Sequence, residues 1–78
     1  MGGAPLFVGQ GTSDEVINIA ITKKWVREQC AAGYKLDFRT YSGLSHMGVL
    51  DGATSALPKQ LAAWTADRFA GRPAPNTC

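Results

Sequence analysis

The chain has 78 residues, which gives room for one small domain, and its 45% of hydrophobic residues excludes general disorder. Eight basic and six acidic residues give a net charge of +2, and the basic ones are scattered rather than interleaved with aromatics, which excludes a nucleic-acid or acidic-membrane footprint. No apolar stretch approaches the ~20 residues of a membrane span, and the amino terminus has no signal-peptide pattern.

The first half of the chain predicts a strand followed by a helix. Residues 5–9 form a short, unbroken apolar run, which is typical of a strand buried on both faces of a parallel sheet. Thr12 and Glu15 stand three residues apart, as in a capping box, and therefore favour a helix that begins near residue 13. Gly33 is a suitable carboxyl-terminal cap, so the predicted helix covers residues 13–32.

The second half predicts another strand and another helix. In residues 34–40, Tyr34, Leu36 and Phe38 alternate with charged residues, which indicates a half-buried strand with one wet face near a sheet edge. A loop rich in serine and glycine follows up to Thr54. Residues 55–70 form the last predicted helix, with Pro58 in its first turn, where no intrahelical donor is lost.

The element order predicts an α/β fold in a single domain over residues 1–78. A strand-helix-strand unit makes its two strands parallel, with a right-handed crossover. A sheet of only two strands leaves a fully apolar strand partly exposed to solvent, so residues 5–9 are expected to have neighbouring strands on both sides. The β-α-β-α pattern therefore resembles the end of a larger parallel sheet.

Asp14 and His46 are the candidate catalytic pair. Each follows a predicted strand, and loops at the carboxyl ends of neighbouring parallel strands lie side by side. An aspartate that accepts the imidazole Nδ1–H fixes the tautomer and stabilises the imidazolium. The alternatives are that Asp14 only caps a helix and that His46, the only histidine, is an exposed loop residue without a task.

A nucleophile is missing from the sequence. There is no G-x-S-x-G motif, Ser45 directly adjoins His46, and Cys30 falls within the predicted first helix. A lone histidine without a second ligand four residues away matches no usual metal site, and nothing indicates a cofactor. Cys30 and Cys78 are too far apart for a Cys-x-x-Cys site, and their spacing leaves a disulfide and two separate thiols equally open.

The order of these segments resembles that of the secretory lipases in the α/β-hydrolase superfamily, the group of the yeast lipase A type and its actinobacterial relatives. The similar segments are residues 5–9 with 11–16, residues 26–33, Ser45-His46, and Trp64 with residues 67–75 and Cys78. The resemblance covers the chain from residue 5 to residue 78. Ile17 departs from it, because many hydrolases have a proline soon after the acid.

The resemblance implies the carboxyl-terminal part of a secreted serine lipase or esterase. Asp14 then matches the triad acid, His46 matches the general base, and Cys30 with Cys78 matches positions that can form a disulfide. The implied partners are a lipid or other carboxylic ester and the missing amino-terminal part, which carries the nucleophile, the oxyanion-hole strand and the lid. Because stabilisation of the oxyanion usually contributes most to the rate acceleration, the chain alone is expected to be inactive.

Two alternatives belong to other functional classes. A non-enzymatic module can use an exposed sheet edge to bind a partner or to self-associate. A small stand-alone hydrolase would need an unorthodox nucleophile, such as Ser45 or Cys30.

Overall fold

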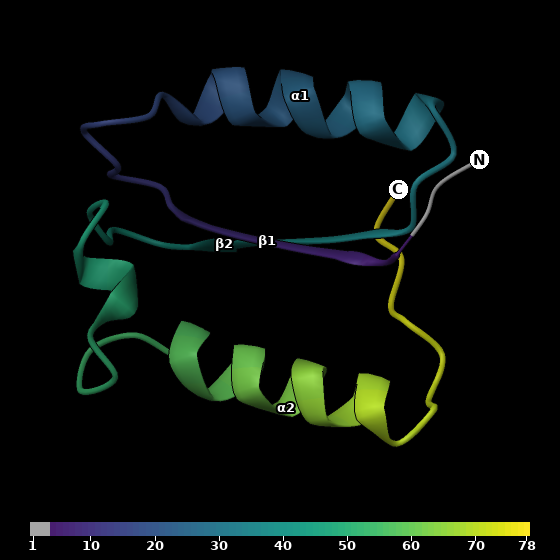
Figure 1. The fold of residues 1–78 in the computed structure, drawn as a ribbon. Helices are drawn as coiled ribbons and strands as arrows, with labels where there is room; N and C mark the ends of the chain where they lie inside the picture. The colour runs from purple at the N-terminus through teal and green to yellow at the C-terminus, as the bar shows by residue number, and fades with distance from the viewer. Residues whose placement is uncertain (1–3) are drawn as a thin grey trace.

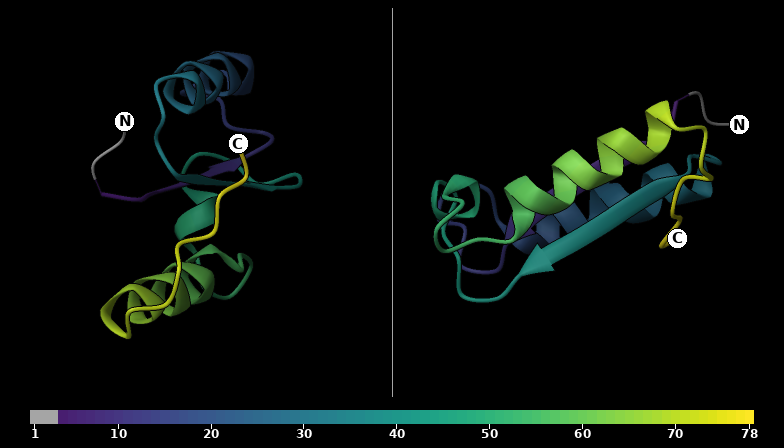
Figure 2. Two further views of the ribbon diagram at one scale, coloured as in Figure 1. Left: turned by 90° about the vertical axis from the view of Figure 1, so that its right-hand side faces the viewer. Right: turned by 90° about the horizontal axis from the view of Figure 1, so that it is seen from below.

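A computed structural model describes residues 4–78 as a three-layer α/β sandwich (Figure 1). The elements, in chain order, are β1 (Leu6–Gly11), α1 (Ile19–Ala31), β2 (Leu36–Tyr41), the short 3-10 helix η1 (Gly48–Leu50) and α2 (Leu57–Phe69). The two strands form a parallel sheet, and α1 covers one face while α2 covers the other (Figures 1 and 2). The predicted parallel α/β arrangement is thereby confirmed.

The strands pair in a single register, from Leu6 opposite Leu36 to Gly11 opposite Tyr41. Their carboxyl ends therefore finish at the same level, at the end of the sheet where η1 lies (Figure 1). This shared end is the edge at which open α/β sheets build their sites. Among residues 4–78, neither helix is long and apolar enough to cross a lipid bilayer.

The core is small. Leu36 is the one large side chain among the described residues that is completely buried. On the α2 side, the buried residues Tyr41, Val49 and Leu57 form a cluster against which Phe7 and Leu44 pack.

The prediction that one face of the second strand is exposed to solvent is wrong at Asp37. Both faces of the sheet are covered, so the side chain of Asp37 is only 3% exposed. Arg39, two residues later on the same face, donates to it with Nη2–Oδ2 at 2.7 Å. The guanidinium also lies over the ring of Phe7, which packs edge-on against Trp64 of α2. Arg39 thus compensates for the burial of the carboxylate.

The first helix begins at Ile19, six residues later than the predicted residue 13, and ends at Ala31. Its amino-terminal cap is Asn18, whose Oδ1 accepts from the N–H of Ala20 at 2.8 Å. The expected capping box of Thr12 and Glu15 is therefore wrong. Both side chains accept instead from backbone N–H groups of the loop after β2.

The tail after α2 returns to the sheet and runs beside β2 (Figure 2). Thr77 donates its N–H to the carbonyl of Leu36 at 2.8 Å, and its Oγ1 accepts from the N–H of Phe38 at 3.0 Å. A disulfide joins Cys78, the last residue, to Cys30 of α1, with the two Cα atoms 5.5 Å apart. The tail therefore links both helices across the edge of β2.

Candidate active site

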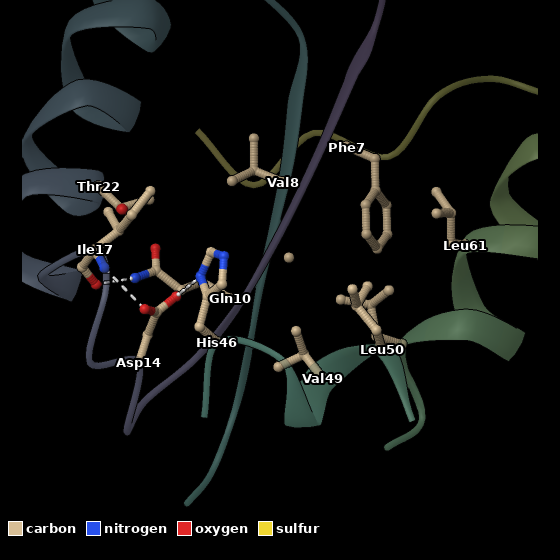
Figure 3. A pocket seen from close by; sticks show the side chains of 12 residues that line it. Phe7, Val8, Gln10, Asp14, Ile17, Thr22, His46, Val49, Leu50 and Leu61 are labelled. Carbon is tan, nitrogen blue, oxygen red and sulfur yellow. Dashed lines mark hydrogen bonds and ion pairs between the residues drawn. The ribbon is translucent and has the colours of Figure 1, made fainter. Parts of the chain in front are cut away.

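The structure brings Asp14 and His46 into contact at the carboxyl end of the sheet. Asp14 lies in the turn after β1, and His46 lies in the loop after β2. The imidazole Nδ1 is 2.9 Å from Oδ2 of Asp14, which is a hydrogen-bonding distance (Figure 3). Topology alone predicts this neighbourhood, because the two strands are parallel and in register.

The carboxylate of Asp14 is held on both oxygens. Oδ1 accepts from the N–H groups of Val16 and Ile17, each at 2.8 Å, and Oδ2 faces His46. The side chain is only 5% exposed. The hydrogen bond from the N–H of Ile17 is the largest influence on the pKa of Asp14, and it lowers this pKa. Desolvation of the buried carboxylate raises the pKa, while His46 and the N–H of Val16 lower it further. Asp14 therefore stays ionised at neutral pH and well into the acid range.

An ionised carboxylate decides which tautomer the imidazole adopts. Because Oδ2 of Asp14 can only accept, neutral His46 carries its proton on Nδ1 and leaves Nε2 with a free lone pair. That second ring nitrogen points away from Asp14 toward the middle of the neighbouring pocket (Figure 3). The side chain of His46 is 38% exposed, so the imidazole is partly open to solvent. The pair is therefore arranged to take a proton at Nε2.

Backbone and side-chain hydrogen bonds fasten the acid turn to the histidine loop. Besides the Asp14–His46 bond, they are Thr12 N–H to Tyr41 O at 3.0 Å, Gly43 N–H to Thr12 Oγ1 at 2.7 Å, Ser13 N–H to Leu44 O at 3.0 Å and His46 N–H to Glu15 Oε2 at 3.3 Å. The three-residue spacing of Thr12 and Glu15 is that of a helix cap and does not predict this role. No local pattern reveals it, because each bond spans about thirty residues.

Gly11 permits the close approach of the two loops. A Cβ atom at this position would overlap the carbonyl oxygen of Leu44 and would stand 3.0 Å from Cγ1 of Val49. The overlapped atom belongs to the backbone, so no side-chain rotation can relieve the clash. Any larger residue at position 11 would have to separate the loop of His46 from the turn of Asp14.

A pocket of about 450 Å³ opens beside the pair (Figure 3). Most of its lining is apolar, and Asp14 and His46 stand at one end of it. It is lined by Phe7, Val8, Gly9, Gln10, Asp14, Ile17, Thr22, His46, Val49, Leu50, Leu57 and Leu61. Nowhere in residues 4–78 do three side chains able to bind a metal ion gather. The pocket therefore suits a ligand whose apolar group lies on this lining and whose reacting group lies beside His46, the proton acceptor.

The other candidate residues lie outside the pocket lining. Cys30 is bonded to Cys78, so it offers no free thiol as a nucleophile. Ser45 Oγ accepts from the N–H of Gly48 at 3.0 Å, which is a turn-stabilising role.

Comparison with known proteins gives one result. A sequence model of the secretory lipases matches residues 1–77, while no curated protein and no solved structure gives a match. The matched region contains both strands, both helices and the Asp14–His46 pair.

Proposed function

The chain belongs to the secretory lipase family, and from this premise we propose that it supplies the acid and the base of a Ser-His-Asp triad that hydrolyses carboxylic esters of lipids. In this proposal Asp14 is the acid, His46 is the general base, and the complete enzyme is secreted. The observation that carries it is the 2.9 Å contact between Nδ1 of His46 and the nearly buried carboxylate of Asp14.

The proposed reaction follows from the free lone pair on Nε2 of His46. A serine hydroxyl attacks the ester carbonyl while Nε2 takes its proton, which forms a tetrahedral oxyanion and an imidazolium. Asp14, accepting from Nδ1–H, stabilises that imidazolium. The imidazolium then gives its proton to the departing alcohol, and the acyl group stays on the serine. Water repeats the sequence and releases the acid.

The serine and the oxyanion donors are proposed to come from residues other than these 78. The sequence contains no G-x-S-x-G motif, and the hydroxyl of Ser45, the residue before His46 in the chain, is held in a turn. Without a nucleophile, an oriented imidazole can move a proton but forms no acyl-enzyme. The chain alone is therefore expected to leave unactivated esters intact.

A fusion enzyme tests this proposal. The amino-terminal part of a secretory lipase, including its G-x-S-x-G serine, is joined ahead of this chain, and hydrolysis of a short-chain triacylglycerol is followed by acid release. We expect turnover by the fusion enzyme and none by the chain alone. The same fusion with His46→Ala should fall to background, because no other histidine of this chain can replace it.

Two results would contradict the proposal. One is turnover by the chain alone that disappears in His46→Ala, which would place a nucleophile within these residues. The other is a folded, disulfide-bonded fusion enzyme whose activity does not change in His46→Ala. Nitrophenyl esters are avoided because any exposed imidazole cleaves them slowly.

A further inference from the structure

Gln10 is a buried amide beside the acid–base pair, and the triad chemistry does not use its hydrogen bond. It is the last residue but one of β1, and it is only 6% exposed. A buried side-chain amide is costly unless it is hydrogen-bonded. Nε2 of Gln10 donates to the carbonyl of Ile17 at 2.8 Å (Figure 3). This bond joins the end of β1 to the segment that leads into α1.

The alternation of side chains along β1 explains why Gln10 reaches Ile17. Phe7 packs against Trp64 of α2, so its side chain lies on the α2 face of the sheet. Successive side chains point to opposite faces, which places Gln10, three residues later, on the α1 face. The chain returns to this face at Ile17, shortly before α1 begins at Ile19. The amide therefore faces the backbone of the acid turn.

Two hydrogen bonds hold the backbone of Ile17. Its N–H donates to Oδ1 of Asp14 at 2.8 Å, and its carbonyl accepts from Gln10 at 2.8 Å. Residues 15–18 have no regular secondary structure, and within residues 4–78 the side chains of Val16 and Ile17 are 67% and 46% exposed. Burial of these side chains therefore contributes little to fixing the segment, and the hydrogen bonds determine where its N–H groups point.

The orientation of the Asp14 carboxylate depends on this segment. Oδ1 accepts from the N–H groups of Val16 and Ile17, which leaves Oδ2 for Nδ1 of His46. If the segment moved away, Oδ1 would lose both donors and the carboxylate could turn about χ2, a torsion with broad preferences. The alignment of Oδ2 with the imidazole would then be lost.

We propose that Gln10 is a positioning residue of the acid–base pair, because it holds Ile17 where the backbone fixes Oδ1 of Asp14 and directs Oδ2 at His46. The inference rests on the proposed function, since it assigns Gln10 to the same reaction. Gln10 acts through the backbone of Ile17 and not by contact with the ester. Its loss should therefore lower kcat and leave KM nearly unchanged.

The alternative is that Gln10 binds the ester directly, because it also lines the pocket. A polar group that only binds the ester contributes to KM, whereas a positioning residue contributes to kcat. The ionisation of Asp14 separates the two roles as well. A contact with the ester has no effect on Asp14 when no substrate is present, whereas the bond to Ile17 acts at all times.

Two variants of Gln10 test the proposal by NMR of the 78-residue chain. Gln10→Met removes the N–H donor and keeps a similar volume, and Gln10→Asn keeps an amide that is too short to reach Ile17. In both, the pKa of Asp14 from a ¹³C carboxylate titration should rise, because the N–H of Ile17 that lowers it is held less firmly. The neutral ring of His46 should also lose part of its preference for a proton on Nδ1.

The matched control is Gln60→Met, which makes the same substitution outside the pocket lining. It removes the acceptor of the Tyr41 hydroxyl, 2.7 Å away, and should leave the titration of Asp14 unchanged. In the fusion enzyme, Gln10→Met should lower kcat by about 10- to 100-fold and change KM by less than about twofold. Gln60→Met should change kcat by less than about twofold.

The wild-type chain offers a check that needs no variant. A side-chain N–H of Gln10 should exchange slowly with solvent and show a scalar coupling to the carbonyl carbon of Ile17 across the hydrogen bond. Absence of both signals would overturn the proposal, as would an unchanged pKa of Asp14 in a folded Gln10 variant. So would a raised KM at an unchanged kcat in the fusion enzyme. The NMR measurements need no serine, so they stand or fall separately from the proposed ester hydrolysis.

Discussion

The Asp14→Asn variant of the fusion enzyme is expected to have its kcat lowered by about 10⁴-fold, the size of effect seen when a triad acid loses its charge. An asparagine keeps an oxygen that can accept from the N–H groups of Val16 and Ile17, so the turn itself can persist. Its amide, however, can donate to the imidazole and favours a proton on Nε2 of His46. The base then has no lone pair to offer the serine. Measurement of kcat at saturating ester checks this.

The matched control is Asp51→Asn, which removes the same charge from a carboxylate that accepts from the N–H of Ala53 in an exposed turn. Its kcat should stay within about twofold of the parent fusion enzyme. If Asp14→Asn lowered kcat less than tenfold, Asp14 would be a turn residue and not the triad acid.

Asp14 also makes stability depend on pH in a defined direction. Its pKa in the folded protein lies below the ordinary value of 3.8, chiefly because of the N–H of Ile17. The stabilisation it provides is therefore present above its unfolded pKa and is lost as the pH falls through the folded pKa. The wild type and Asp14→Asn should accordingly become more alike in stability below about pH 4.

Removal of the disulfide is expected to destabilise the fold strongly. Cys30 and Cys78 enclose a loop of 48 residues, for which the chain-entropy model gives about 4 kcal/mol of stabilisation. Small domains have total stabilities of about 5–15 kcal/mol, and within residues 4–78 only one large side chain, that of Leu36, is completely buried. The Cys30→Ser, Cys78→Ser double variant should therefore unfold at much lower denaturant concentrations, with its tail released from β2.

Urea unfolding followed by circular dichroism checks the disulfide prediction. Reductant should lower the unfolding free energy of the wild type by about 4 kcal/mol and should not affect the double variant. The double variant serves as the control for direct effects of the reductant. A wild-type loss below about 1 kcal/mol would show that packing, rather than the crosslink, fixes the tail.

The sequence allows the order of elements and the closeness of Asp14 and His46 to be predicted, because both follow from local patterns and parallel topology. The apolar run and the alternating run mark β1 and β2, and parallel strands bring the following loops together. The start of α1 at Ile19 is not predicted correctly. Thr12 and Glu15 have the spacing of a helix cap, yet they bond to the loop of His46.

Contacts between distant residues explain what the sequence does not reveal. Asp37 occupies a polar position of an alternating strand but is buried, because α2 covers that face and Arg39 pairs with the carboxylate. Thr77 lies in a tail without periodicity, yet it occupies the edge of β2. The role of Gly11 depends on the carbonyl of Leu44, more than thirty residues away.

Determination of the tautomer of His46 by NMR tests the proposed acid–base pair most directly. His46 is the only histidine, so the two ring nitrogens are identified without ambiguity in a ¹⁵N-labelled sample by two-bond proton–nitrogen correlation. We predict that the neutral ring of the wild type carries its proton on Nδ1 and that Asp14→Asn removes this preference. A wild-type ring protonated on Nε2, or one that averages between tautomers as free imidazole does, would contradict the pairing of Asp14 with His46.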